Sequence, residues 1–121
     1  MGVSMYPGRA SWSYSGFGSF RDRLAQAEGF DLREMAGFAP FDAPEDWTGK
    51  PWDTVHTTLE PLLNHSDCDG YLDAYECEQV IPRLRQIIAT WPESDYDRQH
   101  GEALIKGMEH CVEHGCSMRF A

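Results

Sequence analysis

The most regular pattern of apolar and polar residues lies in the second half of the chain, where it predicts helices. Apolar residues recur every three or four positions over residues 77–91, which is the spacing that one buried face of a helix requires. Pro82 lies inside this stripe and predicts a kink or a short break, because proline has no backbone N–H to donate. A second stripe begins after Asp95 and ends before Gly115, and it predicts a C-terminal helix over residues 95–114.

The first half of the chain is less regular and richer in glycine and proline. Residues 1–18 predict a partly irregular segment that includes a short strand or hairpin. Ser19 predicts the start of a helix that Gly29 ends. At the other end of the chain, residues 116–120 predict an edge strand.

The stretch of residues 37–52 contains several prolines and glycines and predicts a loop. Its large apolar side chains are Phe38, Phe41 and Trp47, and we expect them to pin the loop to the core.

A short helix is predicted near residues 57–64, because Thr57 and Glu60 fit a capping box. The chain is therefore expected to be a mainly α single domain spanning residues 1–121. Its centre would be a helix–loop–helix unit over residues 57–90, with two short strands near the N- and C-terminal ends.

The charge balance of the chain is strongly acidic. Twenty Asp and Glu residues oppose ten Lys and Arg residues, which gives a formal net charge of −10. This balance argues against a protein that binds nucleic acid or an anionic membrane. The sequence has neither an apolar run that could span a bilayer nor a signal peptide, so we expect a cytoplasmic protein with reduced cysteines.

The stretch from His65 to Glu76 carries the most specific chemical pattern in the sequence. With Gly70 at the sixth position, it matches a single EF-hand calcium loop at every ligand position except the first. Calcium takes roughly six to eight oxygen ligands, and the glycine permits the sharp turn that gathers them. The predicted metal ligands are His65, Asp67, Asp69, Tyr71 through its carbonyl, Asp73 and Glu76.

Two features of this stretch are also compatible with a loop that binds no calcium. The first ligand of such a loop should be an aspartate, whereas the imidazole of His65 suits zinc, copper or nickel better than calcium. In addition, Asp73 and Glu76 fit a capping box for the helix that follows, and Asp69 with Gly70 is an ordinary turn dipeptide. The same residues therefore also fit a loop that binds no metal.

The segment LLNHSDCDG at residues 62–70, followed by Glu76–Cys77 and by PRLR at residues 82–85, resembles small uncharacterised proteins of actinobacteria and their phages. The similarity extends from Trp12 through Glu113. What the resemblance implies is a cytosolic, phage-related setting rather than a mechanism.

A second metal motif lies near the C-terminal end. His110 and His114 fit the pattern His-x-x-Glu-His, which places two histidines on the same side of a helix. A zinc protease of this type would need a third ligand far downstream, and the sequence has none there. The pattern therefore favours a non-catalytic zinc site in which Cys116 is the third ligand and His100 or a loop cysteine is the fourth. The plain alternative is that these histidines are solvated and Cys111 lies in the core.

We therefore expect a small acidic protein without catalytic activity, in which residues 65–76 bind a calcium ion structurally. The alternative is a phage-related protein that binds and modulates a host protein, because an acidic surface with aromatic residues exposed between Phe38 and Trp52 attracts basic partners. A zinc site at His110 and His114 is the third hypothesis.

Overall fold

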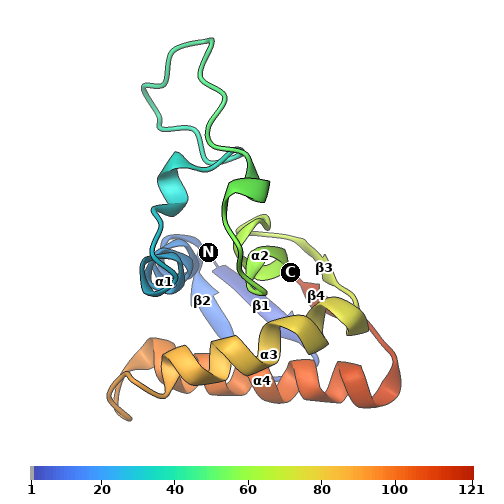
Figure 1. Cartoon of the computed structure of the whole chain (residues 1–121). Helices are drawn as coiled ribbons and strands as arrows, with labels where there is room; N and C mark the ends of the chain where they lie inside the picture. Colours follow the sequence, from blue (N-terminus) through green and yellow to red (C-terminus); the bar gives the residue numbers. More distant parts are fainter. Residues whose placement is uncertain (1) are drawn as a thin grey trace.

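The computed structural model describes residues 2–121 and shows a small antiparallel sheet with helices packed against it (Figure 1). The helices and strands follow one another in the order β1 (Gly2–Tyr6), β2 (Ser11–Ser13), α1 (Tyr14–Ala27), α2 (Glu60–Leu63), β3 (Gly70–Leu72), α3 (Ala74–Ile88), α4 (Tyr96–His114) and β4 (Met118–Phe120). Two short 3-10 helices, η1 (Leu32–Glu34) and η2 (Trp52–Thr54), lie between α1 and α2.

The strands are ordered β2-β1-β4-β3, and each pair of neighbours is antiparallel. The central strands β1 and β4 come from opposite ends of the chain and pair at Met5 and Phe120. Beyond these residues, the backbones of Ser4 and Ala121 exchange two hydrogen bonds of 2.8 and 2.9 Å. Every second side chain of both strands is buried, as the two-residue period of a strand requires.

The prediction of a mainly α fold is wrong, because the structure is a mixed α/β fold with a four-stranded sheet. The described part of the irregular segment expected over residues 1–18 supplies β1 and β2, while Met1 lies outside the described residues. Residues 57–90 do not form a helix–loop–helix unit, since α2 is a single turn and β3 joins the sheet. The strand expected at residues 116–120 is β4, and it lies inside the sheet rather than at its edge.

Helix α1 begins earlier than the sequence predicted, at Tyr14 rather than after Ser19. The hydroxyl of Ser13 caps it by accepting a hydrogen bond of 3.0 Å from the backbone N–H of Gly16. The face that α1 buries consists of Phe17, Phe20, Arg21, Leu24 and Ala25.

Helices α3 and α4 correspond to the two apolar stripes of the sequence, and they pack side by side (Figure 1). Helix α3 continues through Pro82 without a break. Pro82 and Glu78, whose carbonyl the proline leaves without its helical partner, both lie on the exposed side of the helix. Helix α4 begins after Asp95, whose carboxylate accepts a 3.1 Å hydrogen bond from the N–H of Arg98. It ends at Gly115, which adopts the left-handed conformation with φ of 64°.

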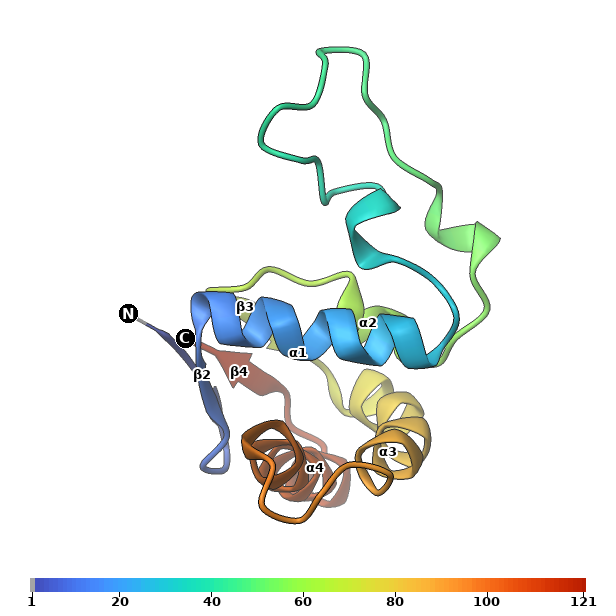
Figure 2. The ribbon, with the colours of Figure 1, turned by 90° about the vertical axis from the view of Figure 1, so that its left-hand side faces the viewer.

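The hydrophobic core lies where α1, α3, α4 and the inner face of the sheet meet. Figure 2 shows α1 crossing one side of the α3–α4 pair, with the strands at one end of the body. Among the described residues, no helix has the length and apolar character that a membrane crossing requires.

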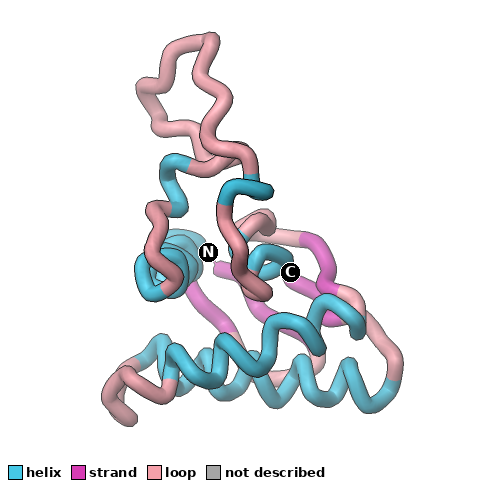
Figure 3. The backbone as a smooth tube through the Cα atoms, in the orientation of Figure 1, coloured by secondary structure: helices cyan, strands magenta, loops and turns pink. Residues whose placement is uncertain are grey.

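Residues 37–51 form a loop that projects from this body, and we call it the arm (Figure 3). The prediction that its aromatic residues pin it to the core is wrong for Phe41, which is fully exposed. Phe38 and Trp47 are half-buried. The arm therefore presents a large apolar side chain to solvent.

Candidate functional site

The predicted calcium loop, residues 65–76, connects α2 to the first turn of α3, and its middle part is strand β3. Gly70 has a φ of 109°, so the sharp turn that the sequence predicts at this glycine is present. The turn brings Gly70 against the ring of His65, where a Cβ at residue 70 would lie 3.0 Å from two ring atoms. The backbone at Gly70 therefore agrees with the prediction, and the side chains decide whether a metal ligand set forms.

His65, the first position of the predicted loop, packs against the sheet. Its ring centroid lies 4.3 Å from that of Phe120, and its Nδ1 lies 2.8 Å from the carbonyl oxygen of Ser66. A neutral ring makes this hydrogen bond when Nδ1 carries the proton, so Nδ1 is committed to the backbone. In this arrangement, His65 acts as a packing residue.

Asp73 and Glu76 form a reciprocal capping box at the start of α3. Oδ1 of Asp73 accepts a 2.7 Å hydrogen bond from the N–H of Glu76, and Oε1 of Glu76 accepts a 3.0 Å hydrogen bond from the N–H of Asp73. This is the arrangement without metal that the sequence left open. One oxygen of the carboxylate expected to hold calcium with both oxygens is thus engaged by α3 itself.

Of the remaining predicted ligands, Asp67 and Asp69 have exposed side chains, and Tyr71, whose carbonyl was the predicted ligand, lies in β3 opposite Arg119 of β4. Of the predicted set, the structure joins only Asp73 and Glu76 by side-chain hydrogen bonds. Within residues 2–121, no three His, Cys, Asp or Glu side chains are grouped so that they could hold a metal ion. Calcium binding by this loop stays a prediction, which a titration can test.

Arg21 of α1, which the sequence analysis overlooked, holds the beginning of this loop. Its Nη1 donates hydrogen bonds to the carbonyl oxygen of Leu63, at 3.4 Å, and to that of His65. These carbonyls lie where α2 ends and therefore lack partners within the helix. The spacing of the sequence could have revealed this burial. Arg21 lies four residues after Phe17 and three before Leu24, so in a helix the three side chains share one buried face.

The structure brings two of the predicted zinc ligands together, His110 and His114, whose ring centroids lie 4.2 Å apart, but residues 2–121 contain no group of three metal-binding side chains. His110 and His114 are exposed near the end of α4, whereas Cys116 lies beside the buried thiols of Cys77 and Cys111. Burial raises the pKa of Cys77 to about 11 and that of Cys111 to about 12. Both thiols are therefore protonated at neutral pH, and a protonated thiol is a poor metal ligand and a poor nucleophile.

His100, the predicted fourth zinc ligand, lies near the beginning of α4 and links that helix to β2. Its Nδ1 accepts a 3.1 Å hydrogen bond from the N–H of Ser11, and its ring stacks on Tyr96 with centroids 4.0 Å apart. Nearby, the indole of Trp12 donates a 2.9 Å hydrogen bond to Asp97. These contacts give His100 a structural role at a distance from the other histidines of α4.

The arm ends in two consecutive turns, each of which begins with proline. The N–H of Ala43 donates to the carbonyl of Pro40 at 3.1 Å, and the N–H of Trp47 donates to the carbonyl of Pro44 at 3.0 Å. The residues at the corners of the two turns, which we call the arm tip, are Phe41, Asp42, Glu45 and Asp46. All four are exposed, and none of the three carboxylates forms an ion pair within residues 2–121.

The base of the arm is fixed by backbone and aromatic contacts. The N–H of Ala36 donates a 2.9 Å hydrogen bond to the carbonyl of Lys50, which joins the two ends of the arm. The indole of Trp52 donates a 3.0 Å hydrogen bond to the carbonyl of Ala36. The Trp52 ring also packs edge-on against Phe30 and Phe38, with centroids 6.1 Å apart in both pairs. The arm tip is thus carried by an anchored base.

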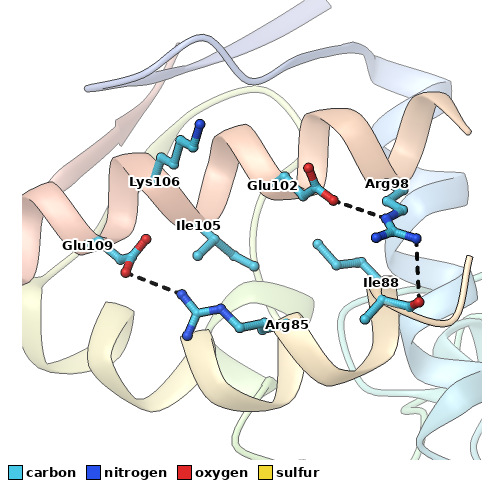
Figure 4. Close-up of a pocket in the computed structure, with 8 residues that line it drawn as sticks. Arg85, Ile88, Arg98, Glu102, Ile105, Lys106 and Glu109 are labelled. Carbon is cyan, nitrogen blue, oxygen red and sulfur yellow. Dashed lines mark hydrogen bonds and ion pairs between the residues drawn. The ribbon is translucent and has the colours of Figure 1, made fainter. Parts of the chain in front are cut away.

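A shallow pocket of about 300 Å³ lies between α3 and α4 (Figure 4). Its two arginines are already paired: Arg85 lies 3.2 Å from a carboxylate oxygen of Glu109, and Arg98 lies 3.0 Å from one of Glu102. Because both guanidinium groups are already paired, neither arginine is free for a ligand. We therefore assign this pocket to the packing of the two helices.

Comparison of the chain with family models, with curated proteins and with solved structures gives no match. The resemblance to small proteins of actinobacteria and their phages accordingly stays a prediction, and the residues themselves carry the functional proposal.

Proposed function

We propose that this chain is a non-enzymatic binding protein that uses the arm tip to engage a basic surface of a partner protein. The observation that carries the proposal is Phe41, a fully exposed phenylalanine held at the corner of a turn and flanked by unpaired carboxylates. When a partner buries an aromatic side chain of this kind, the burial makes the free energy of binding more favourable.

The charges of the arm tip define the chemistry of the partner. Asp42, Glu45 and Asp46 lie within six residues of Phe41 and have no basic partner in the described chain. The net charge of −10 adds a long-range attraction toward basic proteins and repels acidic ones. A complementary site on the partner would therefore have an apolar pocket surrounded by Lys or Arg side chains.

The anchored base supports a binding role, because it lowers the entropy that the arm loses when it binds. The cluster of Trp52 with Phe30 and Phe38 holds the two ends of the arm, and the two proline-initiated turns restrict the tip. A segment that is already ordered before binding retains more of its contact energy as affinity.

The proposal can be tested by placing a photo-crosslinking phenylalanine analogue at residue 41 in cells that make the protein. The matched control places the same analogue at Tyr75, which is an exposed aromatic position on α3 outside the arm. We expect one adduct of defined mass at residue 41 that is missing at residue 75. The crosslinked protein is then identified and purified, and its affinity is measured by calorimetry.

With that purified partner, we expect the triple variant Asp42→Asn, Glu45→Gln, Asp46→Asn to bind about tenfold more weakly at low salt, with a smaller difference at high salt. The substitution Phe41→Ser is expected to abolish most of the binding. Identical adducts at residues 41 and 75, no adduct at residue 41, or equal affinity of the triple variant would each contradict the proposal.

A further inference from the structure

Arg21 is the one charged residue in the described part of the chain whose side chain is buried, with 4% of its surface exposed. Its guanidinium lies against two aromatic rings: Cζ is 4.6 Å from the ring centroid of Phe17 and 5.6 Å from that of Phe38. The rings displace water from the cation, and this burial lowers the pKa of Arg21 from its ordinary value.

The guanidinium of Arg21 also has hydrogen-bond donors without acceptors. Its two hydrogen bonds both leave from Nη1 and end on backbone carbonyls, while Nε has no partner within residues 2–121. No carboxylate of these residues lies within ion-pair distance, and Asp67 and Asp22 act on the cation only from farther away. A buried cation without a counter-ion is unfavourable, so this site would gain stability from an anion.

A pocket of about 400 Å³ opens beside this guanidinium, between the base of the arm and the beginning of the 65–76 loop. Besides Arg21, its walls include the ring of Phe38, Asn64, Ser66 and Asp67. The amide of Asn64 is exposed and makes no side-chain hydrogen bond in the described chain, so it can donate to a ligand. The volume falls in the range of small-molecule sites.

We propose that this pocket binds a small organic molecule with a single carboxylate attached to an apolar group, with Arg21 as the partner of the carboxylate. This pocket is separate from the arm tip. Binding of a ligand here is therefore independent of the proposed contact with a partner protein.

The geometry of Arg21 favours a carboxylate over other anions. The N–H bonds of Nε and Nη2 are parallel, and they match the spacing of two carboxylate oxygens. Phe38 offers an apolar contact for the remainder of the ligand. Asp67 places a negative charge on the wall of the pocket, which disfavours a doubly charged phosphate more than a singly charged carboxylate.

Binding through both nitrogen atoms requires a small movement, because Nε is covered in this structure. Of the two rings against the guanidinium, Phe17 is fully buried on α1, whereas Phe38 is half-buried and belongs to the arm. Of these two rings, Phe38 is the one whose shift would uncover Nε, while the hydrogen bond from Trp52 to Ala36 continues to hold the base of the arm.

The proposal is tested by NMR on the ¹⁵N-labelled full chain, in which the Nε–H signal of Arg21 reports directly on the site. The probe is sodium benzoate, with sodium chloride at equal ionic strength and inorganic phosphate as parallel titrations. We expect benzoate to shift the signal saturably, with half-saturation on the order of 1 mM. Chloride is expected to leave the signal unchanged, and phosphate to bind more weakly than benzoate.

Two exposed substitutions keep the test informative even if Arg21→Lys, which serves to assign the signal, fails to fold. Asn64→Ala is expected to weaken benzoate binding at least threefold, whereas Gln26→Ala, an exposed amide of α1 outside the pocket, leaves it unchanged. Asp67→Asn is expected to tighten binding at least threefold, because it removes the like charge.

Several outcomes would overturn the proposal. They are the absence of a saturable shift with benzoate, an equal shift with chloride, tighter binding of phosphate than of benzoate, unchanged binding in Asn64→Ala, or weaker binding in Asp67→Asn. The last result would show that Asp67 supports the ligand site instead of repelling the anion.

Discussion

At the scale of single residues, Gly107 shows how closely the parts of this fold approach one another. The backbone of α4 at this position faces Pro7, in the turn between β1 and β2, and the side chain of Met118 in β4. A Cβ at residue 107 would lie 2.3 Å from the carbonyl oxygen of Pro7 and 2.6 Å from Cε of Met118. The methionine can move aside, but the backbone carbonyl cannot do so without displacing β1, so the glycine is required by packing.

The substitution Gly107→Ala is therefore expected to lower the free energy of unfolding by about 2 kcal/mol, although alanine is the better helix former. The matched control is Gly18→Ala in α1, where an added Cβ meets no atom within 4 Å. That change is expected to raise the free energy of unfolding by about 0.5 to 1 kcal/mol. Urea unfolding followed by circular dichroism measures both, and equal effects at the two glycines would contradict this explanation.

Residue burial could be predicted from the sequence where it follows a helical period, and not where it depends on tertiary contacts. Cys77, Val80 and Leu84 are buried as the stripe of α3 predicts. Arg21 was missed because arginine is normally a surface residue, and because the helix predicted from Ser19 onward left out Phe17 of the same buried stripe. For Phe41 the sequence supported two opposite expectations, a contact that pins the loop to the core and an exposed aromatic side chain in a binding surface, and no local pattern decides between them.

At the scale of secondary-structure elements, the sequence predicted α3 and α4 well, because long helices repeat the same local signals over several turns. Strand β1 has only five residues, and its partner β4 lies at the opposite end of the chain, so its pairing leaves no local signature. The loop of residues 65–76 was ambiguous for a different reason. A capping box and a calcium ligand pair use the same residue types at the same spacing, and only side-chain geometry separates them.

The capping box at α3 leads to a prediction that distinguishes these two roles. Asp73→Ala is expected to lower the free energy of unfolding by about 1 kcal/mol, because it removes the N-cap acceptor. Glu76→Gln is expected to have little effect, since glutamine can also accept from the N–H of Asp73. Thermal unfolding of both variants and of the unmodified protein is measured with millimolar calcium and with EDTA; if Asp73 and Glu76 act only as a helix cap, each pair of curves coincides.

The opposite result would establish the cation site expected from the sequence. In that case, calcium would raise the melting temperature of the unmodified protein but not that of Glu76→Gln, because the amide cannot replace a carboxylate that binds the ion with two oxygens.

At the scale of the whole molecule, few contacts connect the end of the arm to the body. The contacts that hold the arm belong to its base, whereas the tip makes turns only within itself. We therefore expect that replacing residues 39–48 by two glycines leaves the free energy of unfolding within about 1 kcal/mol of that of the intact chain. The reason is that the entropy lost on closing a loop changes little when the loop is shortened.

The control for this deletion is Trp52→Ala, which removes the indole that anchors the base of the arm. This substitution is expected to lower the free energy of unfolding by about 2 kcal/mol. Denaturant unfolding followed by circular dichroism compares the two proteins. A deletion that costs as much as Trp52→Ala, or that abolishes cooperative unfolding, would show that the arm tip belongs to the folding unit.

The central position of β1 and β4 has a consequence for how this protein is made. Strand β1 is synthesised before β4, yet one of its two edges pairs with residues 119–121. During translation, the backbone groups on that edge have no native partner, and Met5 and Phe120 cannot meet in the core. Closure of this edge therefore requires that β4 has been made, and a nascent chain that stops before Met118 would expose an open strand edge of the kind that aggregates.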